Sequence, residues 1–187
     1  MGTFLIAITG SIESGEIFGI NDIYCKYNFS YGSDWQITAG IEEGISQITT
    51  KDATGTFVWN FPLEVTFKSS NPHGWPQLVL SLYGSDFLGN HVARGYGSTF
   101  LPITTGTSMK KIHLFVPESS SYIQKISSWI VGRRPEFIDP KLIAQGDGRQ
   151  VVRVNSKGYV NVKFEVVMKD FRKLGYVSST PKTIGSD

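Results

Sequence analysis

Two apolar stretches in the first half of the chain show the clearest hydrophobic pattern. In the stretch 57–67, Leu63, Val65 and Phe67 alternate with polar neighbours, and a period of two predicts a strand with one buried face. The stretch 78–83 alternates in the same way. The residues between the two stretches include prolines and a glycine, which favour a turn. We therefore expect the two strands to pair as an antiparallel hairpin in the middle of a β-sheet.

The same alternation recurs along most of the chain. It predicts further strands at 4–12, 23–31, 98–103, 110–117, 149–154 and 159–168. Pro62 lacks an N–H donor, which predicts a kink or an edge position. Arg94–Gly97 predicts a bulge or tight bend, and 155–158 predicts a turn. The interval 32–51 is a long connection, and connections of that size are usually functional or partly structured.

One stretch has the period of a helix. A serine at 119–121 can cap it and Gly132 can end it. Its apolar stripe consists of Tyr122, Ile123, Ile126, Trp129 and Ile130. The stripe either packs on the edge of the sheet or binds a partner, and tryptophan and arginine are enriched in interface hot spots. The candidate partner-binding residues are therefore Tyr122, Ile126, Trp129, Arg133 and Arg134.

Many short strands, glycine- and proline-containing turns and a single helix indicate an all-β fold. We expect an antiparallel β-sandwich with one short amphipathic helix. A chain of 187 residues is long enough to form one domain that buries about 70% of the surface its unfolded form exposes. We place that domain at 1–175 and a flexible C-terminal tail at 176–187.

Composition limits the partners and the cellular compartment that we expect for this protein. The formal net charge of +2 argues neither for nor against a nucleic-acid partner, but the basic residues are scattered, so we expect none. The single cysteine, Cys25, cannot form an internal disulfide, which favours a reducing compartment. A signal peptide has a basic region before its apolar run. The N-terminus of this chain has a short apolar run and no basic region before it. We therefore expect a soluble intracellular protein.

The sequence contains few candidates for catalytic or metal-binding residues. The three histidines have no zinc-ligand spacing, and no nucleophile-elbow, phosphate-loop or EF-hand motif is present. Glu42 and Glu43 are adjacent, so their side chains diverge, and a solvated surface pair is the better interpretation than an acid–base pair. The aspartates are isolated, although they could still converge in space on calcium. We therefore expect no catalytic residues, metal or cofactor.

Several longer strings, taken in order, are more specific. They are Ile41-Glu42-Glu43-Gly44-Ile45-Ser46-Gln47-Ile48-Thr49, Val58-Trp59-Asn60-Phe61-Pro62, Asn71-Pro72-His73-Gly74-Trp75-Pro76-Gln77, Arg94-Gly95-Tyr96-Gly97, Gly132-Arg133-Arg134-Pro135-Glu136-Phe137 and Lys173-Leu174-Gly175-Tyr176. Together they resemble the B9-domain family over nearly the whole chain.

This resemblance implies a C2-like β-sandwich without enzymatic activity, at the transition zone and basal body on the cytoplasmic side of the ciliary base. It implies a structural subunit that assembles with two sibling B9-domain proteins, B9 domain-containing protein 2 and the Meckel syndrome type 1 protein. It further implies membership of a tectonic-containing complex that limits entry of membrane proteins and supports cilium assembly and Hedgehog signalling. The alternative function is a calcium-independent peripheral lipid-binding module with direct membrane contact.

Overall fold

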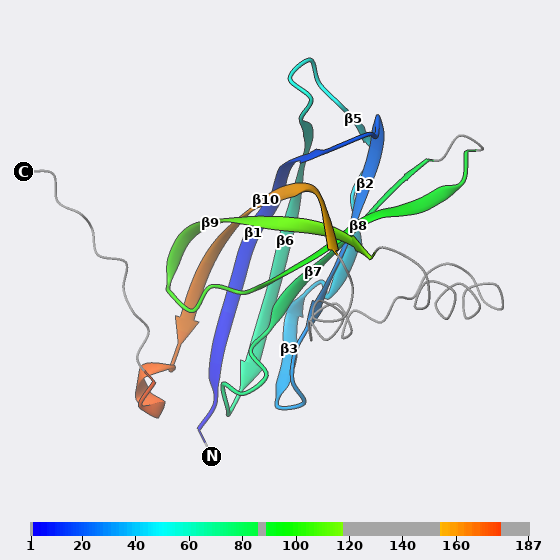
Figure 1. Cartoon of the computed structure of the whole chain (residues 1–187). Coiled ribbons are helices and arrows are strands. Elements are labelled where there is room, and N and C mark those ends of the chain that lie inside the picture. The colour runs from blue at the N-terminus through cyan, green and yellow to red at the C-terminus, as the bar shows by residue number, and fades with distance from the viewer. Residues whose placement is uncertain (1, 86–88, 118–153, 177–187) are drawn as a thin grey trace, which may run out of the picture.

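A computed structural model describes residues 2–85, 89–117 and 154–176 of the chain (Figure 1). Strands make up most of the described residues. The strands are β1 (Phe4–Ile17), β2 (Asp22–Ser30), β3 (Trp35–Gly40), β4 (Glu43–Ile45), β5 (Thr49–Thr50), β6 (Phe57–Ser69), β7 (Gln77–Ser85), β8 (His91–Phe100), β9 (Gly106–Pro117) and β10 (Val154–Lys169). A single 3-10 turn, η1 (Arg172–Leu174), follows β10. The expected helix and the candidate residues on and after it lie outside the described residues.

All the strand pairs are antiparallel and belong to one curled sheet. The strand order is β3-β6-β1-β10-β9-β8-β7-β2-β4, with β5 attached to β2. The curl brings β6 over β2. Phe67 of β6 makes edge-to-face contact with Phe29 of β2, at 5.6 Å between ring centroids. The sheet therefore forms both layers of a sandwich, with β9 and β10 on the closed side (Figure 1). The expected all-β antiparallel fold is confirmed.

The period-two prediction of buried faces is confirmed. In β6, Leu63, Val65 and Phe67 are buried, whereas the Glu64 and Lys68 side chains are exposed. The same alternation fills the core from the other layer through Ile23, Cys25, Tyr27 and Phe29 of β2 and Leu78, Leu80 and Leu82 of β7. Burial of apolar area at about 25 cal/mol per Å² makes this shared core the main source of stability.

The expected hairpin between the strands 57–67 and 78–83 is wrong. Both strands exist, but β6 pairs with β1 and β3, whereas β7 pairs with β2 and β8. Proline and glycine in the connection 70–76 do turn the chain, yet they carry it from one layer of the sandwich to the other. A turn signal fixes a change of direction, and the partner of each strand is set by contacts distant in sequence.

The turn expected at 155–158 is also wrong. Strand β10 continues through these residues, because Asn155, Ser156 and Gly158 pair with β9, and Gly158 also pairs with Ile17 of β1. A register shift between Ser156 and Gly158 accommodates the irregular sequence as a bulge. Gly158 has φ +138 and lies so close to the Glu16 carbonyl that a Cβ would overlap it. A polar, glycine-containing run therefore stays in the sheet when a neighbouring strand pairs with it.

The structure also locates the expected bulge, the expected edge proline and the long connection. Arg94–Gly97 lies inside β8, and the register shift opposite Leu82 and Tyr83 is the expected bulge. The section of β6 that contains Pro62 pairs with β1 alone, since β3 reaches only as far as Val65, so the expected edge position is confirmed. The long connection 32–51 is partly structured, as expected, because it contains β3, β4 and β5.

Aromatic side chains close one end of the sandwich. Phe4 lies at the centre, with edge-to-face contacts to Trp35 and Phe171 at centroid distances of 5.5 and 5.0 Å. Trp75 contacts both Trp35 and Phe171. Tyr176, the first residue of the expected tail, also packs on Phe4 and Phe171. These contacts join the N-terminal strand, the 70–76 crossover and the turn after β10.

Candidate functional site: an isoleucine strap across the open side

The candidate site lies on the open side of the sandwich, where the outer edges of β6 and β2 face each other. Residues 41–48, which we call the isoleucine strap, pass between these edges. The Ile41 amide donates to the Glu64 carbonyl of β6 at 2.9 Å. The Glu42 carbonyl accepts from the Phe29 amide of β2 at 3.1 Å. Two consecutive residues therefore link the two layers.

Ser46 fixes the strap to the core. Its amide donates to the Cys25 carbonyl at 2.8 Å, and its Oγ accepts a hydrogen bond from the Cys25 amide at 2.9 Å. The same Oγ donates to the Gln47 carbonyl at 2.9 Å. Ser46 is buried, so these bonds form away from water, where an unpaired hydroxyl or amide would be costly.

Further contacts fix the strap on both flanks. Its central residues form β4, which pairs with β2 through Lys26, Tyr27 and Asn28. Gly44 is required there, because a Cβ would lie 2.6 Å from the ring of Tyr27. Gln47 returns to β6 by donating from Nε2 to the Trp59 carbonyl at 2.8 Å. The strap is therefore held to both layers along its length.

The side chains on this fixed backbone are unusually apolar for an exposed segment. Ile41, Ile45 and Ile48 are 63%, 58% and 59% exposed. Val58, on the neighbouring edge of β6, is 44% exposed. Single exposed apolar residues are ordinary, but three exposed isoleucines within eight residues are a concentration of apolar side chains. The backbone that carries them is fixed by the hydrogen bonds described above.

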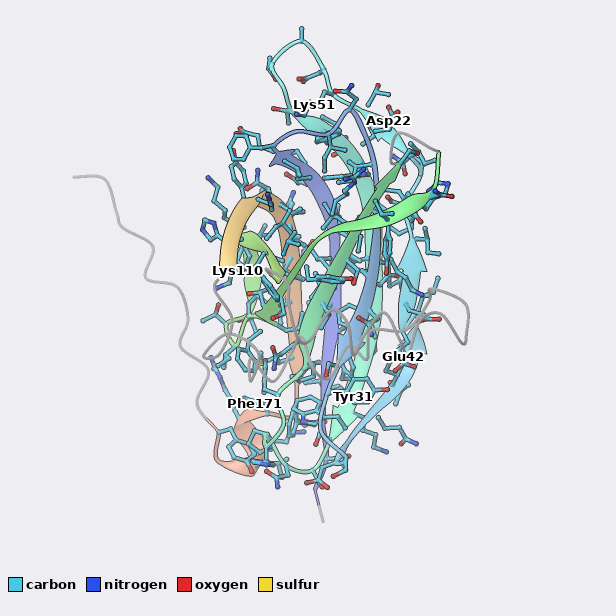
Figure 2. The ribbon with its side chains drawn as sticks, turned by 45° about the vertical axis from the view of Figure 1, so that its right-hand side comes forward. Asp22, Tyr31, Glu42, Lys51, Lys110 and Phe171 are labelled. Carbon is cyan, nitrogen blue, oxygen red and sulfur yellow. The ribbon has the colours of Figure 1, made fainter. Side chains whose placement is uncertain are left out.

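Acidic groups flank the isoleucines. Glu42 and Glu43 are both exposed, and the Tyr31 hydroxyl donates to Glu42 Oε1 at 2.8 Å (Figure 2). Partial burial, this hydrogen bond and the negative charge of Glu42 raise the pKa of Tyr31 to about 12. Tyr31 therefore stays protonated at neutral pH and orients one carboxylate.

The described residues offer no grouped catalytic side chains at this site. Cys25 beneath the strap is fully buried, and burial raises its pKa to about 12, so its thiol is not a nucleophile there. Across residues 2–85, 89–117 and 154–176, no three histidine, cysteine or carboxylate side chains are grouped to hold a metal ion. In the same part of the chain, no helix has the length and apolarity needed to span a membrane. The arrangement is suited to binding an apolar surface.

The strap residues belong to one of the sequence strings that resemble the B9-domain family, but the sequence did not identify them as a site. Isoleucine usually indicates a core position, and exposure cannot be seen in one sequence. The spacing of four and three residues between Ile41, Ile45 and Ile48 does not fit a strand of period two. The same spacing matches one face of a helix, so the pattern alone could not reveal a strap.

Comparison with known proteins gives consistent results over most of the chain. Residues 6–167 match the model of the family B9-C2, described as "Ciliary basal body-associated, B9 protein". B9 domain-containing protein 1 of Xenopus laevis is 59% identical over 175 residues, covering 92% of this chain and 88% of that protein. B9 domain-containing protein 2 of Bos taurus is 24% identical over 170 residues, covering 91% and 97%. A solved C2 domain of plant Extended Synaptotagmin 1 superposes with a TM-score of 0.47 at 13% identity, covering 86% of this chain and 92% of that one.

Proposed function

The chain belongs to the family of ciliary basal body-associated B9 proteins, and from this premise we propose that it is a non-enzymatic structural subunit of the ciliary base. In this proposal it binds sibling B9-domain proteins, B9 domain-containing protein 2 and the Meckel syndrome type 1 protein. Within a tectonic-containing complex at the transition zone it supports cilium assembly and the barrier to membrane proteins. The observation that carries the proposal is the isoleucine strap.

The strap has the physical properties of an interface. Removing a half-exposed isoleucine from water contributes on the order of 1 kcal/mol, so Ile41, Ile45 and Ile48 together supply about 3 kcal/mol before association costs. Those costs are reduced because the hydrogen bonds of Ser46 and Gln47 already order the backbone. Buried apolar side chains inside a rim of Glu42 and Glu43 would reproduce the usual layout of a protein interface.

A lipid-free pull-down with B9 domain-containing protein 2 tests this role. We expect Ile45→Asp combined with Ile48→Asp to weaken capture at least tenfold while the protein stays folded, since both side chains are exposed. The matched control is Ile103→Asp, because Ile103 is a similarly exposed isoleucine (54%) in the connection between β8 and β9. Capture by the folded strap variant at the wild-type level would contradict the assignment of this surface.

The segment outside the described residues supplies a second candidate surface for the same function. Tyr122, Ile126, Trp129, Arg133 and Arg134 combine an apolar stripe with two arginines, the residue types enriched in hot spots. Arg133→Glu with Arg134→Glu belongs in the same pull-down. Loss of capture in this variant alone would move the partner site from the strap to this segment. Loss of anionic-liposome binding, with capture intact, would instead favour the peripheral lipid-binding function.

A further inference from the structure

An unpaired strand edge can pair with another strand, and most of the open edges among the described strands are protected. Strand β6 beyond β3 contains Pro62 and the bulged residue Asn60 at φ +46. The first half of β9 pairs only with β10 and carries exposed Lys110 and Lys111. Strand β4, at one end of the sheet, is only three residues long and includes Glu43. Proline, bulges, lysine and short length are the usual devices against strand addition.

Strand β3, at the other end of the sheet, is different. Its six residues, Trp35–Gly40, contain no charged side chain and no proline. Among the described residues, β3 pairs with β6 on one side and with no strand on the other. Its one protective device is the register shift between Ile37 and Ala39. Beyond Trp35 its residues are partly or fully exposed, so an added strand could reach the backbone.

The edge of β3 leads directly into the isoleucine strap. The Ile41 amide continues the pairing with β6 by donating to Glu64, so a strand added along β3 would reach the exposed Ile41 side chain. Glu42 and Glu43 follow Ile41 in the chain, and the Glu64 carbonyl accepts a hydrogen bond from the Ile41 amide; all three carboxylate side chains are exposed. At the other end of β3, exposed Asp34 precedes Trp35 and exposed Lys68 pairs with Gln36. The edge is thus uncharged along its length, acidic at the Ile41 end and of mixed charge at the Trp35 end. A complementary segment would be uncharged opposite β3 and basic where it passes Ile41.

We propose that β3 is extended by a strand from a partner protein, which carries lysine or arginine at the end that lies beside Ile41. Main-chain hydrogen bonds to β3 supply the affinity, and Ile41 with the three carboxylates selects the side chains and direction of the added strand. This inference rests on the proposed function, because it specifies how the open side of the sandwich holds its partner.

Hydrogen exchange and capture together test the strand. With B9 domain-containing protein 2 as the probe, we expect the backbone amides of residues 36–40 that face away from β6 to exchange at least tenfold more slowly in the complex than in the free chain. Ala39→Lys places a charge on the edge and should weaken capture at least tenfold. Its matched control is Thr9→Lys, because Thr9 is exposed on β1, which is paired on both sides. Gln36→Lys, at another exposed edge position, repeats the test if the first variant is unstable.

The outcomes separate the two proposals. Slow exchange of the outward-facing amides in 36–40 together with loss of capture by Ala39→Lys supports strand addition. Wild-type capture by the folded Ala39→Lys variant, with unchanged exchange of those amides, overturns strand addition and leaves the proposed function standing. Failure of the wild-type chain to capture the sibling overturns both. A β3-dependent homodimer that forms in place of the complex also overturns the assignment to a different partner chain.

Discussion

The amide of Gly32 donates a hydrogen bond to the carbonyl oxygen of Gly74, at 2.9 Å between nitrogen and oxygen. The two backbones are so close that a Cβ on Gly74 would lie 2.6 Å from the Gly32 Cα. This contact joins the turn before β3 to the crossover between β6 and β7, beside the Trp35 indole that donates to the His73 carbonyl. Two glycines thus fix the position at which the chain changes layers.

Gly74→Ala should therefore destabilise the protein by about 2 to 4 kcal/mol, through backbone overlap and an unfavourable positive φ. Gly74 has φ +69, and Gly55 at φ +86 has no atom within 4 Å of a built Cβ. Gly55→Ala is thus the control for the dihedral alone, and about 1 kcal/mol is expected there. Urea unfolding measures both, and equal losses would show that the close approach to Gly32 is unimportant.

Cys25 should report on opening of the isoleucine strap. It is the single cysteine, it is fully buried, and burial raises its pKa to about 12. A thiol-reactive disulfide reagent should not label the native protein faster than the protein opens. Ser46→Ala should speed labelling and destabilise the fold by about 1 to 3 kcal/mol, because the Cys25 amide loses its buried acceptor. Ser33→Ala, at an exposed position, should leave both quantities unchanged, and unchanged labelling in Ser46→Ala would contradict the role of Ser46.

Tyr31 predicts a stability loss at high pH. Burial, followed by its hydrogen bond and charge interaction with Glu42, raises the pKa of Tyr31 from 10.0 to about 12. Its protonated form is favoured in the folded state, so the stabilising contribution is complete below pH 10 and is lost as pH rises through about 12. Tyr31→Phe should therefore lose less stability than the wild type over that interval. Tyrosinate absorbance should show the Tyr31 transition moving lower in Glu42→Gln, and an unmoved transition would contradict the interaction.

Phe67 is the central side chain between the layers. It is fully buried and makes ring contacts with Phe29, Tyr31 and Trp35. Phe67→Ala should cost about 3 to 5 kcal/mol, and Phe67→Asp should abolish soluble expression because it buries an unpaired charge. Phe100→Ala is the matched control, since Phe100 is 58% exposed and its truncation should change stability by less than about 0.5 kcal/mol. A soluble Phe67→Asp protein with wild-type melting would contradict the burial of this position.

Side-chain alternation predicted the buried faces of strands such as β2 and β6, because a period of two directly reflects which side chains point inward. It did not predict the short strands β3, β4 and β5, which lie in the expected connection 32–51. It could not predict which strands pair. The connection 70–76 has the same composition whether it closes a hairpin or crosses between layers. Similarly, the sequence around Gly158 predicts a turn, and pairing with β9, joined by β1 at Gly158, keeps it in a strand.

The candidate site was harder to predict for a different reason. Ile45 could be a core residue by composition, and its exposure depends on Ser46 and Gln47 fixing the strap from beneath. Those bonds join residues whose partners, Cys25 and Trp59, lie on two different strands. A local pattern contains no information about them. The edge of β3 raises the same difficulty, since an uncharged short strand is significant only once its place at the end of the sheet is known.

The pairing of β1 with β10 has a consequence for synthesis of the protein. Ser14 and Asn161 are hydrogen-bonded although they are 147 residues apart in the chain. During translation, β1 leaves the ribosome long before β10 exists, and the two halves of the sheet have no connecting strand until then. Completion of the sheet must therefore wait until β10 has been made, and folding should be slow, as expected for pairings so distant in sequence. A nascent chain that stops before Val154 would expose the apolar faces of β1 and β9 to chaperones and proteases instead of forming a smaller stable domain.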